Sequence, residues 1–180
     1  SETGYRTFAM EGPGALRSER LAKSVGKYKS SFYHFFADLE VFTERLLELL
    51  LRQSQVLSDK ESQAENEPEL IDHLLDHKLD LLFIRQLRVH REYEALAAVF
   101  TRTYEISLPV FLPIWKQIIG LEEHNYLAQT VLMLSLENFF LQITDETLNR
   151  SWITADFDQI REMVRLFKQN QAILPVDGTV

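Results

Sequence analysis

Apolar residues recur at intervals of three and four positions along most of the chain, the spacing that places them on one face of an α-helix. No segment alternates apolar and polar residues in the manner of a half-buried strand, and runs of β-branched residues between turn signals are lacking. The pattern therefore predicts an all-α fold. The expected helices cover about residues 3–11, 18–24, 28–36, 38–57, 69–88, 91–105, 110–119, 121–143 and 156–169.

Three short helices are expected ahead of a long one. Gly-Pro-Gly at residues 12–14 ends the first helix, and Gly26 supplies the turn between the second and the third. The third ends at Ala37 and Asp38, where Asp38 also caps the fourth helix. The side chains expected to face inward from the short helices are Leu21, Val25, Phe32, Phe35 and Phe36.

Polar and proline-containing stretches predict the breaks in the rest of the chain. Residues 58–68, SDKESQAENEP, are polar throughout and end in proline, so we expect a loop there. Pro109 and Pro113 indicate a helix start near residue 110, because a missing N–H is tolerated best in a first turn. Asp156 is expected to cap the last helix, with Gln159 reaching back to it.

Charge is distributed unevenly along the chain, whose formal net charge is −8. Residues 1–36 hold six basic and three acidic side chains, net +3, whereas residues 37–180 hold 13 basic and 24 acidic ones, net −11. Charges on a protein surface act over about 8 Å at physiological salt. The N-terminal part can therefore face a polyanion that the remainder of the chain repels.

The stretch LRSERLAKSVGKYKSSFYHFF, residues 16–36, has the spacing of a helix-turn-helix, whose second helix enters the major groove of DNA. Residues 8–50 resemble the DNA-binding domain of the tetracycline-repressor (TetR) family. The matching elements are FAMEG at Phe8–Gly12, LAKSVG at Leu21–Gly26, YKSSFYHFF at Tyr28–Phe36 and an apolar helix beginning near Glu40.

The resemblance implies two domains and a function. A helix-turn-helix DNA-binding domain, with its first helix truncated, is expected over residues 1–38, and a helical effector-binding and dimerisation domain over residues 39–180. The implied protein is a homodimeric transcriptional repressor that binds a palindromic operator in double-stranded DNA through its third helix. A small-molecule effector is expected to release it.

Basic and polar residues of the helix-turn-helix are the candidate DNA contacts. The side chains expected to bind phosphates, which position a protein on DNA, are Arg17, Ser18, Lys27, Lys29, Tyr33 and His34. Tyr28, Ser30 and Ser31 are expected nearer the base edges. Serine pairs with several bases, so no operator sequence follows from them.

Two further groups of residues are predicted in the second domain. By the resemblance, the effector pocket is expected at Tyr93, Phe100, Tyr104, Phe111, Trp115 and Glu137. Aromatic residues at helical spacing are also typical of a core, and Glu137 could instead pair with an arginine or with the dimer mate. The last two helices have apolar surface to spare and predict a four-helix dimer interface that includes Leu127, Val131, Leu134, Phe139, Met163 and Phe167.

Other functions find little support in the sequence. Cysteine, a G-x-S-x-G elbow, H-E-x-x-H and a glycine-rich phosphate loop are all lacking, so we expect neither an enzyme nor a cofactor. His73 and His77 stand four apart without a third ligand, so no metal site is expected. The longest apolar stretch, residues 126–143, is interrupted by polar residues, so we expect no membrane partner. The lack of cysteine fits a reducing compartment, so we expect a cytoplasmic protein.

Two alternatives remain open. One is an all-helical interaction module that kept the fold without DNA affinity, favoured by the acidic total and by Leu39, where the family commonly has a lysine. The other is a carrier of a hydrophobic metabolite, which needs the pocket but not the lysines.

Overall fold

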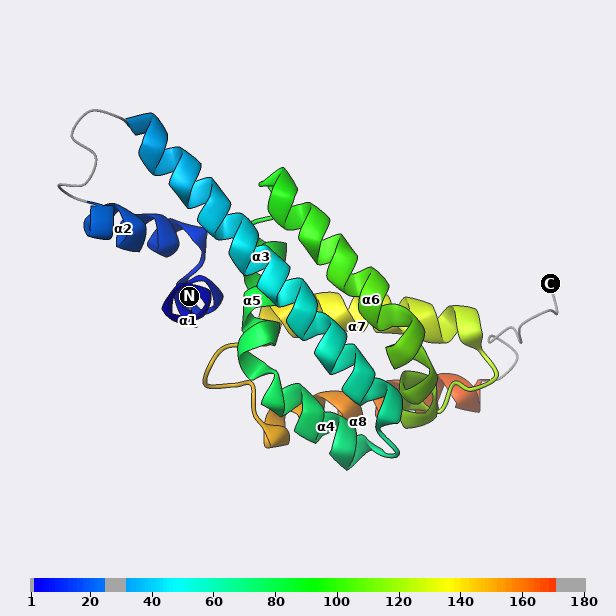
Figure 1. Ribbon diagram of the computed structural model, residues 1–180. Helices are drawn as coiled ribbons and strands as arrows, with labels where there is room; N and C mark the ends of the chain where they lie inside the picture. Colours follow the sequence, from blue (N-terminus) through cyan, green and yellow to red (C-terminus); the bar gives the residue numbers. More distant parts are fainter. Residues whose placement is uncertain (1, 25–31, 171–180) are drawn as a thin grey trace.

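The computed structural model describes residues 2–24 and 32–170, and these parts of the chain form helices joined by short connections (Figure 1). They contain no β-strand, which confirms the predicted all-α fold class. The helices are α1 (Glu2–Glu11), α2 (Pro13–Ser24), α3 (Phe32–Gln63), α4 (Glu67–Asp76), α5 (Lys78–Val89), α6 (Glu94–Ile119), α7 (Asn125–Gln142) and α8 (Arg150–Gln169).

The Gly-Pro-Gly sequence separates α1 from α2, as predicted. Gly12 has a φ of 88°, a left-handed conformation that favours glycine, and its N–H donates to the Phe8 carbonyl oxygen at 2.9 Å. Pro13 opens α2, where its missing N–H leaves no helical bond unmade. α2 therefore begins earlier than the predicted start at Ser18. The predicted turn at Gly26 lies outside the described residues.

One long helix, α3, takes the place of the predicted end of the third helix and the whole of the fourth. It continues through Ala37 and Asp38, so the predicted break there is wrong. The stretch contains no glycine or proline, and nothing in it competes strongly with the helical conformation. α3 thus crosses the expected domain boundary at residue 38 without interruption. The predicted start of the third helix near Tyr28 lies outside the described residues.

The predicted loop at residues 58–68 is mostly helical. α3 continues to Gln63, and only residues 64–66 separate it from α4. Ser58 is buried, and its hydroxyl donates to the Ile106 carbonyl oxygen of α6 at 3.3 Å. Packing against α6 therefore keeps this polar stretch helical, which its composition does not indicate.

The predicted helix at residues 69–88 is two helices that meet at His77. This residue ends α4 and precedes α5 with φ −107° and ψ 25°, and its backbone N–H donates to the carbonyl oxygens of His73 and Leu74. Its side chain is buried. The break therefore places the side chain of His77 in the protein interior, where it contacts polar side chains of α3 and α5.

The two helices predicted at residues 91–105 and 110–119 are one helix, α6. Pro109 and Pro113 lie inside it with their rings exposed, so the lost hydrogen bonds face solvent rather than the core. α6 is long and apolar enough to cross a membrane by length and composition alone. Core helices of soluble proteins share these properties, so the finding does not place α6 in a membrane.

The last two helices begin elsewhere than predicted. Gly120, with φ 74°, ends α6, and a short turn precedes α7 at Asn125. α8 begins at Arg150 because Asn149 caps it, its side-chain oxygen accepting from the Trp152 N–H at 2.9 Å. Asp156, predicted as the cap, lies instead in the second turn of α8.

The core extends from α1 to α8 and crosses the expected domain boundary. α3 and α6 lie side by side, and α1 packs across α5 (Figure 1). The rings of Tyr5 and Phe8 stack on Phe83 of α5 with centroid separations of 4.6 and 4.2 Å. Phe8 and Phe83 are fully buried. The first helix is therefore held by an apolar interface to the part of the chain that carries the candidate site.

Candidate functional site

A cavity of about 110 Å³ lies among α3, α4, α5, α6, α7 and α8. Most of its wall consists of leucine, isoleucine and aromatic side chains. For comparison, an engineered apolar cavity of about 150 Å³ in another protein binds benzene. The polar residues of the wall are Ser54, Glu61, Thr103, Tyr104, Ser107, Ser135 and Asp156.

Two groups of aromatic rings, contributed by α6, α7 and α8, form part of the cavity wall. Phe111 and Trp115 of α6 have ring centroids 5.9 Å apart, and Trp115 meets Phe157 of α8 edge to face at 5.9 Å. Phe100 and Phe140 make a second edge-to-face pair, also at 5.9 Å, between α6 and α7. The mutual packing of these rings fixes their orientation, which gives the cavity a defined shape.

Two carboxyl groups lie at this largely apolar wall. Glu61, near the end of α3, is only 4% exposed, and burial raises its pKa to about 8. Asp156 of α8 is half-buried, and burial likewise raises its pKa. In the described parts of the chain no lysine, arginine or histidine lines the cavity. The acids therefore lie beside apolar surface without a cation at the cavity wall.

A chain of buried polar side chains runs from the end of α3 to α1. The Lys60 ammonium lies 2.9 Å from Nε2 of His77, and Nδ1 of His77 lies 2.8 Å from a carboxylate oxygen of Asp80. The other oxygen of Asp80 accepts the Tyr5 hydroxyl. A lysine can only donate and a carboxylate can only accept, so this geometry fits neutral His77 with its proton on Nδ1. Burial, together with Asp80, raises the pKa of Tyr5 far above its ordinary value, so Tyr5 remains a donor.

The structure brings four of the six predicted pocket residues to the cavity wall, namely Phe100, Tyr104, Phe111 and Trp115. The other two, Tyr93 and Glu137, do not line it. Tyr93 precedes α6 and is 49% exposed. Glu137 faces α5, where its carboxylate accepts from Arg88 Nε at 2.8 Å. The alternative reading of Glu137 as an arginine partner is thus the one that the structure supports.

Sequence reasoning missed the polar residues that give the cavity its chemical character. Glu61 lies in the stretch predicted to be a solvated loop, and Asp156 was expected to cap a helix. Neither position carries a signal of burial, because Glu61 lies in a polar stretch and Asp156 is a residue type that commonly caps a helix. Their distance in sequence from the aromatic residues of α6 also hides the fact that they share a cavity with them.

The candidate DNA-binding residues lie only partly within the described residues. Lys27, Tyr28, Lys29, Ser30 and Ser31 lie outside them, and Tyr33 is in the first turn of α3. The other three, Arg17, Ser18 and His34, are exposed.

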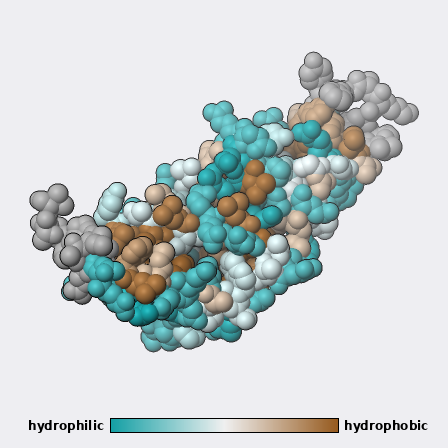
Figure 2. Space-filling view, turned by 180° about the vertical axis from the view of Figure 1, so that it is seen from behind, coloured by the Kyte–Doolittle hydropathy of each residue, from teal (hydrophilic) through white to brown (hydrophobic). Residues whose placement is uncertain are grey.

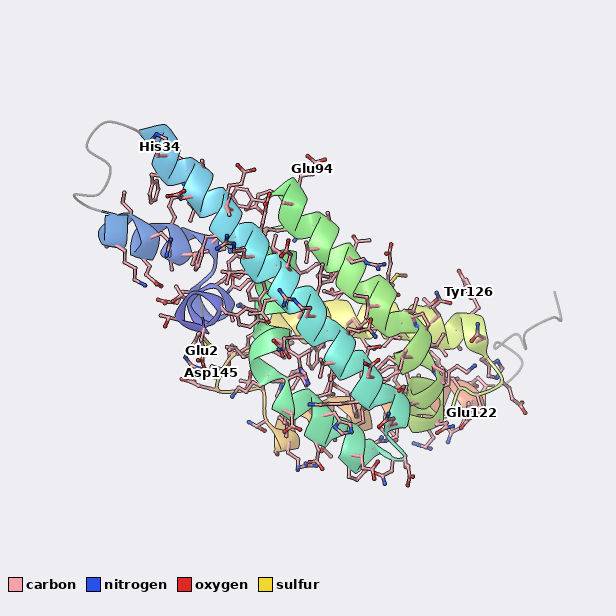
Figure 3. All side chains as sticks on the ribbon, viewed as in Figure 1. Glu2, His34, Glu94, Glu122, Tyr126 and Asp145 are labelled. Carbon is pink, nitrogen blue, oxygen red and sulfur yellow. The ribbon has the colours of Figure 1, made fainter. Side chains whose placement is uncertain are left out.

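The exposed candidates lie at one end of the molecule. Figure 3 shows His34 at the N-terminal end of α3, with Glu122 and Tyr126 at the opposite end. Two expectations for this region are corrected: Leu21 is 53% exposed and Phe36 is 36% exposed, whereas both were predicted to face inward. Phe35 is buried, as predicted.

The residues predicted for the dimer interface fall into two groups. Val131 and Phe139 are buried inside the chain, and Leu127 is half-buried. Placing Val131 and Phe139 on a surface was therefore wrong. α7 is apolar on nearly all sides, so its sequence does not reveal which side faces outward.

An exposed apolar stripe nevertheless exists on both C-terminal helices. The exposed members among the predicted residues are Leu134, Met163 and Phe167, and the structure adds Tyr126, Met133, Leu141 and Leu166. On α7 these positions recur at helical spacing and share one face. Figure 2 shows that apolar side chains reach the rear surface in several groups, one of them at the end of the molecule opposite α2.

Comparisons with known proteins do not identify the chain. No protein-family model matches it, and no curated protein or solved structure matches it. The assignment of a function therefore depends on the residues and on their geometry.

Proposed function

We propose that the protein is a ligand-responsive DNA-binding regulator of the tetracycline-repressor type, a repressor that acts as a homodimer. The observation that carries the proposal is the course of α3. This helix begins beside the basic N-terminal segment, and its far end contributes Ser54, Leu57 and Glu61 to the cavity. A single helix thus joins the candidate DNA-binding end to the candidate ligand site.

The N-terminal end has the charge and exposure that a DNA-binding surface needs. Residues 1–36 carry a net charge of +3 in a chain of −8. Arg17, Ser18 and His34 are exposed near the start of α3. Phosphate contacts by such side chains supply sequence-independent affinity, and the remaining acidic surface orients this end toward DNA.

Contacts within the chain favour coupling between the two ends. The Arg20 guanidinium lies over the Phe42 ring at 4.2 Å, so α2 is attached to α3. The chain of polar contacts from Lys60 to Tyr5 attaches the cavity end of α3 to α1. A ligand that binds better to one position of α3 would therefore also change the placement of α1 and α2.

A homodimer would cover the exposed apolar residues of α7 and α8, and it would present two recognition helices to a palindromic operator. The apolar stripes on α7 and α8 are suited to pair across a twofold axis as a four-helix bundle. Dimeric helix-turn-helix proteins place two recognition helices in successive major grooves about 34 Å apart.

A fluorescence-anisotropy titration tests the proposal. Labelled duplexes from the DNA that flanks the protein's own gene are compared with a random-sequence duplex of equal length, between about 50 and 200 mM salt. We expect one flanking duplex to bind about a thousandfold or more tighter than the random one, with affinity that falls as salt rises. Equal, salt-independent binding to both duplexes would refute DNA recognition.

The cavity also favours a second candidate, a carrier of a hydrophobic metabolite. A carrier needs an enclosed apolar site but no DNA affinity, and the same titration separates the two functions. A protein that binds a small molecule in the cavity but binds flanking and random DNA equally weakly would be a carrier.

A further inference from the structure

Glu61 is an acid without a neutralising partner at the wall of an apolar cavity. Its side chain is 4% exposed, and within the described residues it has no ion-pair partner. An isolated carboxylate is strongly disfavoured in such surroundings, so the group is held as a neutral acid or needs a cation beside it.

The basic residue next to Glu61 in the sequence does not supply that cation. The Lys60 ammonium is directed to His77, 2.9 Å away, and His77 in turn contacts Asp80. This lysine is thus engaged in the buried chain that leads to Tyr5. A ligand in the cavity is therefore left to neutralise the charge of Glu61.

A second carboxyl reaches the same cavity from another helix. Asp156 lies in the second turn of α8, where Asn149 already caps the helix, so helix capping does not explain its position. Residues of the wall from the described parts of α3 to α8 include no lysine, arginine or histidine. An anionic ligand would therefore meet two acids and no counter-charge.

The aromatic part of the wall also favours a cation. Phe111, Trp115 and Phe157 form one group of rings, and Phe100 with Phe140 forms another. The face of an aromatic ring attracts an ammonium group, and the attraction is strongest where water is excluded. Acids and aromatic rings around one cavity are together suited to an organic cation.

We propose that the cavity binds an apolar organic molecule that carries a protonated amine, with Glu61 as its main counter-ion and Asp156 as the second. The inference rests on the proposed function in one respect, that the cavity is the effector site. Its volume of about 110 Å³ is smaller than that of the cavity of about 150 Å³ that binds benzene, so the ligand is at most one aromatic ring with a short side chain, and the wall must move slightly to admit it. The protonated amine supplies the positive charge that Glu61 lacks in the protein, and the ring contacts the apolar side chains of the wall.

Three small compounds of matched shape test the ligand class by isothermal titration calorimetry on the full chain. They are phenethylamine, phenethyl alcohol and phenylacetate, which are cationic, neutral and anionic at neutral pH. We expect phenethylamine to bind about tenfold or more tighter than the other two, because only it forms a charge-assisted hydrogen bond with a carboxylate.

Variants identify the counter-ion. Glu61→Gln should weaken phenethylamine about tenfold or more and leave phenethyl alcohol unchanged, whereas Asp156→Asn should have a smaller effect of the same sign. Glu44→Gln is the matched control, since Glu44 is an exposed glutamate of the same helix. It removes the same charge and should change neither affinity. Circular dichroism confirms that each variant is folded.

The other outcomes overturn the inference. Equal or stronger binding of the alcohol or the carboxylate would show an apolar site with a different ligand class, and would leave the proposed effector site standing. Phenethylamine binding that survives Glu61→Gln would remove the assigned counter-ion. No binding by any of the three would reject the site as described, while the DNA titration would still decide the regulatory function independently.

Discussion

Replacing Glu61 by glutamine should stabilise the protein at neutral pH, although it removes a buried carboxyl group. Glutamine has nearly the same shape and stays neutral, so it keeps the packing against α6. Glu61 has an ordinary pKa of 4.5, and burial raises the pKa to about 8 in the folded protein. Between these two pH values the folded chain holds a proton that the unfolded chain has released.

This difference in bound protons determines the sign and size of the effect. Because the folded state binds more protons, the free energy of unfolding falls as the pH rises from 4.5 toward about 8. The slope for one such group is about 1.4 kcal/mol per pH unit. From about pH 5 to about pH 7 the wild-type protein should therefore lose about 3 kcal/mol relative to Glu61→Gln. Above about pH 8 the difference should level off.

Urea denaturation followed by circular dichroism, at intervals across this pH range, measures the difference directly. All other ionisable groups are shared by the two proteins, so their contributions largely cancel. Glu44→Gln provides the control, because it makes the same replacement at an exposed position of the same helix. A difference for Glu61→Gln that does not change with pH would show that its carboxyl is solvated, and would remove the main reason for assigning it to a ligand.

Two further experiments test the attachment of the N-terminal helices and the dimer. Gly12→Ala should destabilise the fold by about 1 to 3 kcal/mol in urea denaturation, since φ is positive and the new Cβ would lie 2.9 Å from Oε1 of Gln86. Gly14→Ala, where the new Cβ has no neighbour within 4 Å, should be neutral or stabilising, and equal losses for both would contradict the role of Gly12. Light scattering should give twice the chain mass of 21.1 kDa for the wild type and the single mass for Leu134→Asp with Leu141→Asp, whereas an unchanged mass would move the interface elsewhere.

Local chemistry accounts for the parts of the fold that the sequence predicts correctly. The pair Gly12 and Pro13 ends α1 by local chemistry, because glycine readily adopts positive φ and proline lacks the N–H that would continue the helix. The helical spacing of apolar residues is likewise a local property of the sequence and does not depend on contacts with other helices, so the all-α class could be predicted. Phe111 and Trp115 were expected at a pocket only because of the resemblance to the tetracycline-repressor family, since aromatic residues four apart in one helix are equally typical of a core.

Long-range contacts account for the parts that were missed. The stretch around Ser58 and Glu61 has the composition of a loop, and only its packing against α6 makes it helical. Glu137 pairs with Arg88, which lies 49 residues away in the sequence. A pattern of apolar and polar residues registers neither kind of contact, because it treats every acid as solvent-facing. Glu61 and Asp156 are acids, which normally face solvent, so the sequence does not predict their burial. The same property makes their position at an apolar cavity informative about its ligand.

The DNA affinity of a variant that lacks Lys27 and Lys29 tests the central claim most directly. Anisotropy titrations with a flanking duplex compare the wild type, Lys27→Ala with Lys29→Ala, and Lys116→Ala with Lys168→Ala, which removes the same charge from α6 and α8. If both N-terminal lysines bind phosphates, the first double variant should bind more weakly, and the slope of log affinity against log salt should fall by about 1.8. The second double variant should behave like the wild type. Equal affinity and slope for all three folded proteins would contradict DNA binding through the N-terminal segment.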